Sequence, residues 1–377
     1  MVTNSRVATL GSRTGRAVVA LTAALSLLLV GCASDSGESS GQGTELESAA
    51  QRQLYEQAVA DGGKLSLFIG TSGNQATRRF LEKFNEEFPD LRVEHISGTS
   101  DQILERLMTE KRAGLNNADV LLAAGMVPFK LADQAGFIER FTPEDADLFT
   151  GEGNTYIDGV AYGFSDVYNA VCYNPNNVTP EEIELLHEYQ GWTDPRFKGR
   201  AAIVDPAGFG YRHGLTYWVF QDPDLGENWL QRIAALQPTV YHTANTAGPQ
   251  VIAGEHDVVF NAMTIHGARA SHEGAPLECA TGPYAPAYSF SVGLVKDGPN
   301  TAAGKLFINW LLSESGQLAV QDTYAFSARR EGMDVPVVDD DWWQIPDDIR
   351  YTDETIVESR YAELSEMFNG MFGAAKN

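Results

Sequence analysis

The chain has 377 residues and a formal net charge of −24 at pH 7. Its 43% hydrophobic and 10% aromatic residues are ordinary for a globular protein, and the length predicts about two domains. The acidic balance argues against binding to nucleic acid and against electrostatic docking on anionic lipid. It leaves an anionic ligand open, because a cleft is governed by its local groups.

The first 31 residues are expected to be a signal peptide. Three arginines and no acid precede an apolar run of about 15 residues, which is short for a membrane-spanning helix. The run ends in Leu29-Val30-Gly31-Cys32, which resembles a bacterial lipoprotein box. The resemblance implies that Cys32 is lipidated, becomes the first mature residue and anchors the protein to the outer face of the cytoplasmic membrane, in an extracellular or periplasmic location. An incidental cysteine after a secretory signal is the alternative.

Residues 32–44 are rich in serine and glycine and are expected to form a flexible tether. From residue 45, predicted helices and strands alternate with short connectors, which indicates an α/β fold with a largely parallel sheet. The predicted strands are 64–69, 92–96, 119–123, 201–204, 239–241, 257–261 and 288–295. The predicted helices are 45–61, 76–88, 102–112, 126–135, 211–220, 248–253 and 301–312, with a last helix around 368–371.

Four segments in this order are similar to the solute-binding proteins of bacterial ABC importers. The branch is the one that contains ferric-ion-binding proteins and relatives that bind thiamine, phosphonates or phosphorylated compounds. The segments are LYEQAVADGGKLSLFIGTSG at 54–73, ADVLLAAG at 118–125, WTDPRFKGRAAIVDPAGFGY at 192–211 and PNTAAGKLFINWLLSESGQ at 299–317. The third segment departs from the family pattern by two residues fewer between its aspartate and its Lys-Gly pair.

The resemblance implies a type II periplasmic-binding-protein-like fold with two α/β lobes, a ligand cleft between them and two crossover strands as the hinge. The crossings are expected near 165–171 and 281–288. Lobe 1 would comprise 45–165 with 286–377, and lobe 2 would comprise 166–285. The implied function is capture of a small molecule for an ABC permease with its ATPase, by a monomer with no cofactor and no nucleic acid partner. A sensor lipoprotein that keeps the fold is an alternative.

Ligands in open α/β sheets sit beyond the carboxyl ends of the strands, so four strand-to-helix turns are candidate ligand sites. Each turn offers backbone N–H groups at a helix N-terminus, which suit carboxylate, phosphate or phosphonate. The same residues could instead be plain helix caps. The candidates are Thr71, Ser72, Gly73, Asn74, Gly98, Thr99, Ser100, Gly208, Phe209, Gly210, Thr243 and Asn245.

Larger side chains near these turns are further candidates. Arg212 could pair bidentately with an anion or be a solvated residue of its helix. Asp166 and Tyr168 lie in the first predicted crossing and Tyr288 in the return crossing. Each could contact the ligand or make a hydrogen bond that stabilises the hinge.

Iron is the less favoured ligand. The ferric-binding relatives hold iron with two adjacent tyrosines after the strand that corresponds to 257–261, and this chain has Ala262-Met263-Thr264-Ile265-His266 there. Asn261, Met263 and Thr264 therefore become cleft-wall candidates for an organic ligand. His266 and His272 are expected at the surface, no metal site is predicted, and the leading ligand is a small organic anion: a phosphonate or a phosphorylated or carboxylated metabolite.

The chain lacks the G-x-S-x-G, H-E-x-x-H, G-x-x-x-x-G-K-[ST] and G-x-G-x-x-G patterns, so an enzyme is not expected. Cys172 and Cys279 form no metal motif, and both are expected on strands beside the hinge. In an oxidising exterior they could pair as a disulfide, or they could be two buried free thiols. Both interpretations are open.

Overall fold

The computed structural model describes residues 48–70, 75–149, 156–157, 159–322, 333, 348–373 and 375. The chain divides into two units, residues 1–43 and 44–377, and only the second is treated below. The predictions for the signal peptide, the tether, Cys32 and the turn Thr71, Ser72, Gly73 and Asn74 lie outside the described residues. Within the described ranges, no helix combines the length and apolarity needed to cross a membrane.

The strands form one mixed sheet in the order β2-β1-β3-β10-β5-β8-β6-β7. β1 pairs in parallel with β2 and β3, and β6 pairs in parallel with β7 and β8, while β10 and β5 are antiparallel to each other and to their outer neighbours. The strands are β1 (Lys64–Ile69), β2 (Arg92–Ser97), β3 (Val120–Ala124), β4 (Tyr156–Ile157), β5 (Ala161–Tyr173), β6 (Ala201–Val204), β7 (Thr239–Tyr241), β8 (Val258–Met263), β9 (Glu278–Ala280), β10 (Ala285–Leu294) and β11 (Ile349–Tyr351).

Helices cover both faces of this sheet, which confirms the predicted α/β class. They are α1 (Ala49–Ala60), α2 (Gln75–Glu87), α3 (Ser100–Arg112), α4 (Val127–Gln134), α5 (Pro180–Leu186), α6 (Phe209–Phe220), α7 (Gly226–Ala235), α8 (Ala244–Ile252), α9 (Thr264–His272), α10 (Thr301–Leu312), α11 (Glu314–Gln321), α12 (Glu354–Ser359) and α13 (Tyr361–Phe372).

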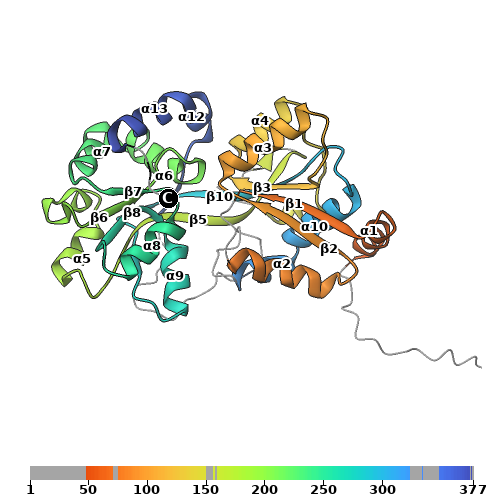
Figure 1. Ribbon diagram of the computed structural model, residues 1–377, viewed down its shortest axis with the longest axis horizontal. Coiled ribbons are helices and arrows are strands. Elements are labelled where there is room, and N and C mark those ends of the chain that lie inside the picture. The colour runs from red at the N-terminus through yellow and green to blue at the C-terminus, as the bar shows by residue number, and fades with distance from the viewer. Residues whose placement is uncertain are drawn as a thin grey trace, which may run out of the picture. The chain divides into compact units, whose positions relative to one another are not determined.

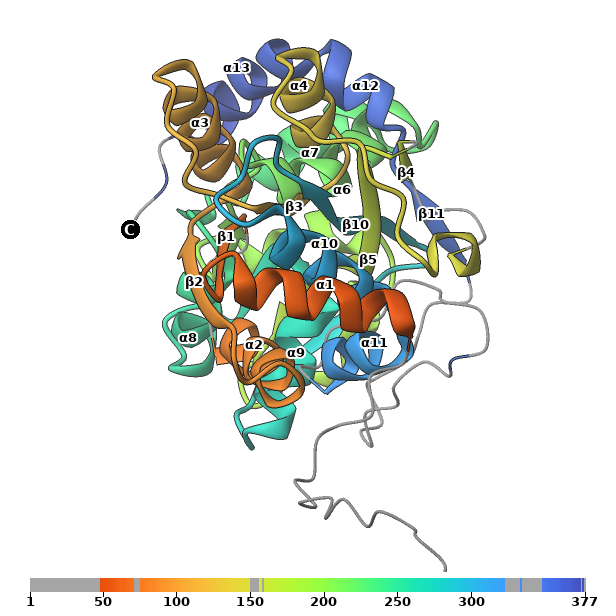
Figure 2. The same ribbon diagram turned by 90° about the vertical axis from the view of Figure 1, so that its right-hand side faces the viewer.

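The first lobe is built around β1, β2 and β3. Side chains alternate between the two faces of a strand, so Leu65 and Leu67 pack with α1, α2, α10 and α11, whereas Phe68 packs with α3 and α4. In Figure 2, α1 lies in front of α10 on the first of these faces. Phe84, Phe307 and Trp310 form an aromatic cluster at the centre of that core.

The second lobe repeats this arrangement around β6, β7 and β8. Ile203 faces a core shared by α5, α6, α7 and α13, and Val204 faces a core shared with α8 and α9. Trp192, Trp218 and Trp229 are each almost fully buried in the first of these cores.

Three segments pass between the lobes. The long strands β5 and β10 pair side by side across the middle of the sheet, where both predicted crossings lie (Figure 1). The third is the C-terminal segment, whose β11 pairs with β10 before α12 and α13. The sequence-based boundaries placed this segment in lobe 1, and this is corrected for α13: Leu364 and Phe368 are fully buried in the core of the second lobe.

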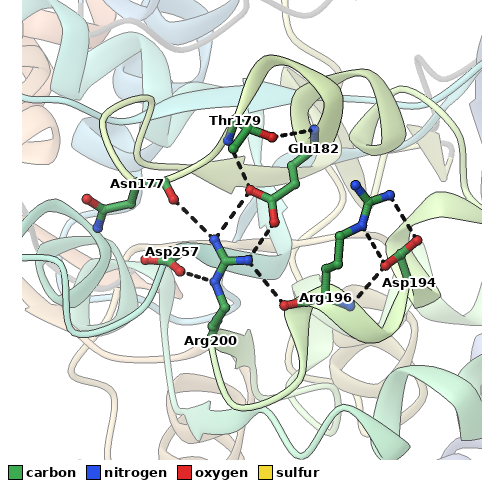
Figure 3. A network of polar contacts seen from close by, with 7 residues as sticks. All are labelled: Asn177, Thr179, Glu182, Asp194, Arg196, Arg200 and Asp257. Atoms are coloured by element: carbon green, nitrogen blue, oxygen red, sulfur yellow. Dashed lines mark hydrogen bonds and ion pairs between the residues drawn. The ribbon is translucent and has the colours of Figure 1, made fainter.

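The segment that carries the strongest resemblance, 192–211, is tied into the second lobe by Arg200 (Figure 3). Its guanidinium lies 2.5 Å from a Glu182 carboxylate oxygen, also bonds Asp257, and donates to the Asn177 carbonyl at 3.1 Å. Glu182 in turn accepts from the Thr179 N–H at the start of α5. The hydrogen bond from Arg200 lowers the pKa of Glu182. Arg200 therefore holds together the segments before β6, before β8 and at the start of α5, and this part of the motif stabilises the fold.

Neighbouring residues of the motif are also structural. Asp194 caps a short 3-10 turn by accepting from the Arg196 N–H and pairs with the Arg196 side chain (Figure 3). Gly199 has φ +74°, a left-handed conformation that glycine adopts without the penalty of a side chain. The glycine requirement thus comes from the turn that leads into β6.

Candidate ligand-binding site

A cavity lies between the two lobes at the carboxyl ends of β1, β3 and β8, the usual ligand position in such sheets. The starts of α3, α6, α8 and α9 and parts of β5 and β10 complete it. Its lining residues are Ile69, Gly70, Thr77, Phe80, Thr99, Ser100, Leu122, Ala124, Phe164, Ser165, Gly208, Gly210, Tyr211, His242, Thr243, Asn245, Met263, Ile265, His266, Arg269, Tyr288, Phe290 and Val320.

The cavity is larger than a single ion requires. Its volume is about 140 Å³ on the scale on which one water molecule needs roughly 10–15 Å³. On that scale it has room for a molecule of about ten non-hydrogen atoms.

The four helices whose first turns line the cavity differ in how they are capped. α3 and α8 each begin with a capping box, in which Thr99 and Thr243 accept from the N–H three residues later. α6 begins at Gly208, which has no side chain to cap it. α9 begins after Met263, which also makes no capping hydrogen bond through its side chain. The N–H groups in the first turns of α6 and α9 are therefore the ones that a bound anion could satisfy.

Arg269 brings a positive charge to the cavity from the second turn of α9. Burial lowers its pKa to about 10, and the neighbouring Tyr211 and Glu273 oppose this shift, so the guanidinium is charged at pH 7. Among the described lining residues there is no aspartate or glutamate. The side-chain charge that faces the cavity is therefore positive, although the protein as a whole is acidic.

His266, one turn before Arg269, is neutral. Burial lowers its pKa to about 3, and the nearby Arg269 charge acts in the same direction. Its Nδ1 lies 3.1 Å from the Met263 carbonyl oxygen, and because a carbonyl only accepts, Nδ1 must carry the proton. Nε2 is then an acceptor, suited to a ligand hydroxyl or to a metal ion.

Two tyrosines line the same cavity. Burial raises the pKa of Tyr211 to about 12, and its hydroxyl accepts the Ala244 N–H at the start of α8. Burial also raises the pKa of Tyr288 well above 10, and its hydroxyl donates to the Met263 sulfur at 3.0 Å. Both are neutral phenols at pH 7.

A family model described as bacterial extracellular solute-binding protein matches residues 70–318. That range is well over half of the chain. The chain belongs to this family. Such proteins are the solute-binding components of ABC importers and act outside the cytoplasm.

Individual relatives carry different ligands in their descriptions. Iron uptake protein A1 of Synechocystis sp. is 28% identical over 263 residues, 65% of this chain and 70% of the relative. The iron-bound HitA of Pseudomonas aeruginosa has a TM-score of 0.66 at 19% identity, covering 81% of this chain and 99% of HitA. AfuA of Actinobacillus pleuropneumoniae with fructose-6-phosphate has a TM-score of 0.65 at 17% identity, covering 83% and 100%. The structural neighbours establish the type II periplasmic-binding-protein fold.

Several predicted residues of this solute-binding protein line the cavity, namely Thr99, Ser100, Gly208, Gly210, Thr243, Asn245, Met263 and Tyr288. The hydroxyls of Ser100, Thr99 and Thr243 already have protein partners, however. Ser100 Oγ donates to the Gly70 carbonyl at 2.9 Å and accepts from the Ala124 N–H at 3.0 Å, so it ties β1 to β3. These side chains act as caps and ties, as the alternative interpretation held. Of Phe209 the structure describes only the backbone, which starts α6.

Asp166 and Tyr168 do not line the cavity, which corrects their assignment. The Asp166 carboxylate accepts from Ser289 Oγ at 2.6 Å and from the Tyr351 hydroxyl at 2.9 Å. Tyr168 is buried against β10 and β11. From Ser165 onward the strand alternates: Ser165 points to the cavity, and Asp166 and Tyr168 point to the opposite face. Phe164 also lines the cavity because β5 and β10 pair irregularly there. Asp166 thus joins β5 to β10 and β11 by hydrogen bonds and Tyr168 does so by packing, and a role in the hinge stays a prediction.

Arg212 is also corrected. It is 1% exposed, and its guanidinium lies over the Tyr361 ring at 4.0 Å and donates to Ser365 Oγ at 2.9 Å. Because successive helix residues are rotated by about 100°, Gly208 and Tyr211 face the cavity while Arg212 faces α13. Its side chain is therefore not solvated, and it is absent from the described lining of the cavity.

Gly98, Asn261 and Thr264 are absent from the described lining. Asn261 has φ +57° and is buried, with its amide donating to the Val204 carbonyl at 3.2 Å. Its left-handed backbone lies next to an irregular pairing of β8 with β5, and a periodic strand pattern does not predict such a bulge.

Cys172 and Cys279 are joined by a disulfide. They are directly opposite each other on β5 and β9, beside the start of α9 in the same lobe.

The residues that the sequence-based prediction missed come mainly from α9. His266 was expected at the surface but lines the cavity, and Arg269 was not considered, because no helix was predicted after 257–261. A usable signal existed: Ile265 and Arg269 are four residues apart and so share one helix face if a helix follows the strand. Tyr211, Phe164 and Phe290 were also missed.

Proposed function

We propose that this chain is a lipid-anchored solute-binding protein that captures a small organic anion and delivers it to an ABC permease with its ATPase. The observation that carries the proposal is the charged Arg269 on a cavity whose described lining contains no carboxylate. A hydrogen bond to a charged group contributes roughly 1.5–3 kcal/mol. The uncapped start of α6 at Gly208 adds backbone donors on the same side.

The lobes would close on the ligand by bending of β5 and β10. With the C-terminal correction, the moving bodies are 45–165 with 286–322, and 166–285 with α13. Closure would bring the cavity-facing groups of both lobes onto one compound, so variants in either lobe should weaken its binding.

Ferric iron is a second candidate, favoured by the names of relatives and by three donors, Tyr211, Tyr288 and His266, on one cavity. The donor set is poor for a bare ferric ion, which prefers anionic oxygen ligands. Both tyrosines are neutral at pH 7, and Arg269 lies beside them. Within the described residues, no three His, Cys, Asp or Glu side chains group as metal ligands. Iron would therefore enter as an anionic complex such as ferric citrate.

A ligand screen separates the two candidates. The purified protein is heated with phosphate, phosphate monoesters, phosphonates, carboxylates, citrate, ferric chloride and ferric citrate. A ligand at a hundredfold excess over its Kd should stabilise the protein by about 2.7 kcal/mol. We expect iron-free organic anions to raise Tm. Stabilisation by ferric salts alone, with every iron-free anion silent, would replace the proposal by iron transport.

A further inference from the structure

The two walls of the cavity have different chemistry. The wall from the first lobe and β10 is mostly apolar, with side chains of Ile69, Phe80, Leu122, Phe164, Phe290 and Val320. The wall from the second lobe presents Tyr211, His242, Asn245, His266 and Arg269. The charged, imidazole and amide side chains of the described lining are thus all on the second-lobe wall, beside Met263 and Ile265, and most of the large apolar side chains are on the other wall.

Hydroxyls of Thr77, Thr99, Ser100 and Ser165 also reach this wall, and two of them have the following protein partners. Ser100 Oγ is engaged with Gly70 and Ala124. Thr99 Oγ1 accepts from the Gln102 N–H in the capping box of α3. A polyhydroxylated ligand body placed here would lose hydrogen bonds to water and find few replacements.

We propose that the ligand has two ends, an anionic group held by the second lobe at Arg269 and an apolar body, of alkyl or aryl character, packed against Phe164 and Phe290. This inference rests on the proposed function and adds which organic anions the protein should prefer. The cavity volume fits a phosphate or carboxylate head with a body about the size of one ring.

Phe290 is the residue that decides between apolar and polar bodies. It is partly buried on β10 and packs on the first-lobe core, and its ring plane lies at 65° to the Tyr288 ring. A body that slides beside it replaces water with apolar contact. Each buried methylene should tighten binding by about fourfold.

Matched phosphate monoesters test this directly. Calorimetry on the purified protein measures Kd for methyl, ethyl, n-propyl and phenyl phosphate and for glycerol 3-phosphate. n-Propyl phosphate and glycerol 3-phosphate share a carbon skeleton and differ by two hydroxyls. We expect Kd to fall about fourfold per methylene, and n-propyl phosphate to bind at least tenfold more tightly than glycerol 3-phosphate.

Variants locate the effect. Phe290→Ala should abolish most of the gain from methyl to phenyl phosphate and leave the affinity for methyl phosphate within about twofold. Phe290→Leu serves if the alanine variant does not fold, and the ligand series needs no variant at all. Phe220→Ala is the control, because Phe220 is partly buried on α6 in the second lobe and is absent from the described lining.

The outcomes separate the two claims. Equal affinity along the series, or tighter binding of glycerol 3-phosphate, would overturn the two-ended ligand while leaving an organic-anion transporter in place. Binding of ferric citrate with no binding of any monoester, phosphonate or iron-free carboxylate would overturn both.

Discussion

Glu354 should be a stability-determining residue, because it links both lobes from a nearly buried position. Its side chain is 13% exposed; one carboxylate oxygen lies 3.1 Å from His213 Nε2 on α6, and the other accepts the Met126 N–H at the start of α4 at 3.2 Å. Burial opposes its ionisation, but His213 and the Met126 N–H outweigh burial and lower its pKa below the ordinary 4.5. Glu354 is therefore a buried carboxylate with partners in both lobes.

Glu354→Gln removes the charge and keeps an acceptor for the Met126 N–H. Removing a charged hydrogen-bonding partner at a nearly buried position costs about 3 kcal/mol. At roughly 2 °C per kcal/mol for a chain of this size, Tm should fall by about 6 °C at pH 7. Glu358→Gln, one turn later on α12, is the control: its pair with Lys130 is about 30% exposed, so the loss should stay below about 1 kcal/mol.

Calorimetric scans from pH 7 to pH 3 show whether the stabilisation by Glu354 decreases or increases as the pH falls. Because the pKa of Glu354 is lowered in the folded protein, its contribution is complete above about pH 4.5 and disappears as pH falls through the folded pKa. The difference in Tm between wild type and Glu354→Gln should therefore shrink on acidification below pH 4.5. Equal losses for both variants at pH 7, or a difference that grows in acid, would refute the assignment.

Three further predictions concern the second lobe and the N-terminus. Arg200→Met should lower the free energy of unfolding by about 2–3 kcal/mol, since Glu182 is 6% exposed and loses its cation, whereas Arg196→Met at an exposed pair should cost under about 1 kcal/mol in denaturant titrations. Cys32→Ala should release the protein into the medium or leave it uncleaved; a variant that is processed and still membrane-bound in fractionation would contradict the lipoprotein prediction. Thiol titration of the unfolded protein without reductant should find Cys172 and Cys279 unreactive, and two free thiols would contradict the disulfide.

Much of the framework followed from local patterns. The strands 64–69, 201–204 and 239–241 and the helix 301–312 have the predicted ends, because alternating or helically spaced apolar residues meet clear caps and turns there. The cavity edge followed from the rule that ligands bind beyond parallel strands, which correctly brought Thr99, Gly208 and Thr243 to one place.

The side chains of the site were harder to predict, because each depends on which face of its strand or helix a residue occupies. Along β5, Ser165 faces the cavity and Asp166, the next residue, faces the hinge. Every residue of this strand is buried, so its sequence has no alternation of apolar and polar residues that would show which residues face the cavity. Predicting Arg269 at the site required predicting α9, and the small and polar residues of this helix give only a weak helical spacing of apolar residues. The packing of α13 on the second lobe is a contact between segments about 150 residues apart, which no local pattern reports.

The central claim is that Arg269 binds the anion, and the most direct test compares two arginines of the second lobe. Arg269→Met removes the charge that lines the cavity, whereas Arg212→Met removes a buried charge that faces α13. Calorimetry with n-propyl phosphate should show a loss of about 10- to 150-fold for Arg269→Met, corresponding to roughly 1.5–3 kcal/mol, and a change within about twofold for Arg212→Met. Unchanged affinity in Arg269→Met, or the larger loss in Arg212→Met, would contradict it.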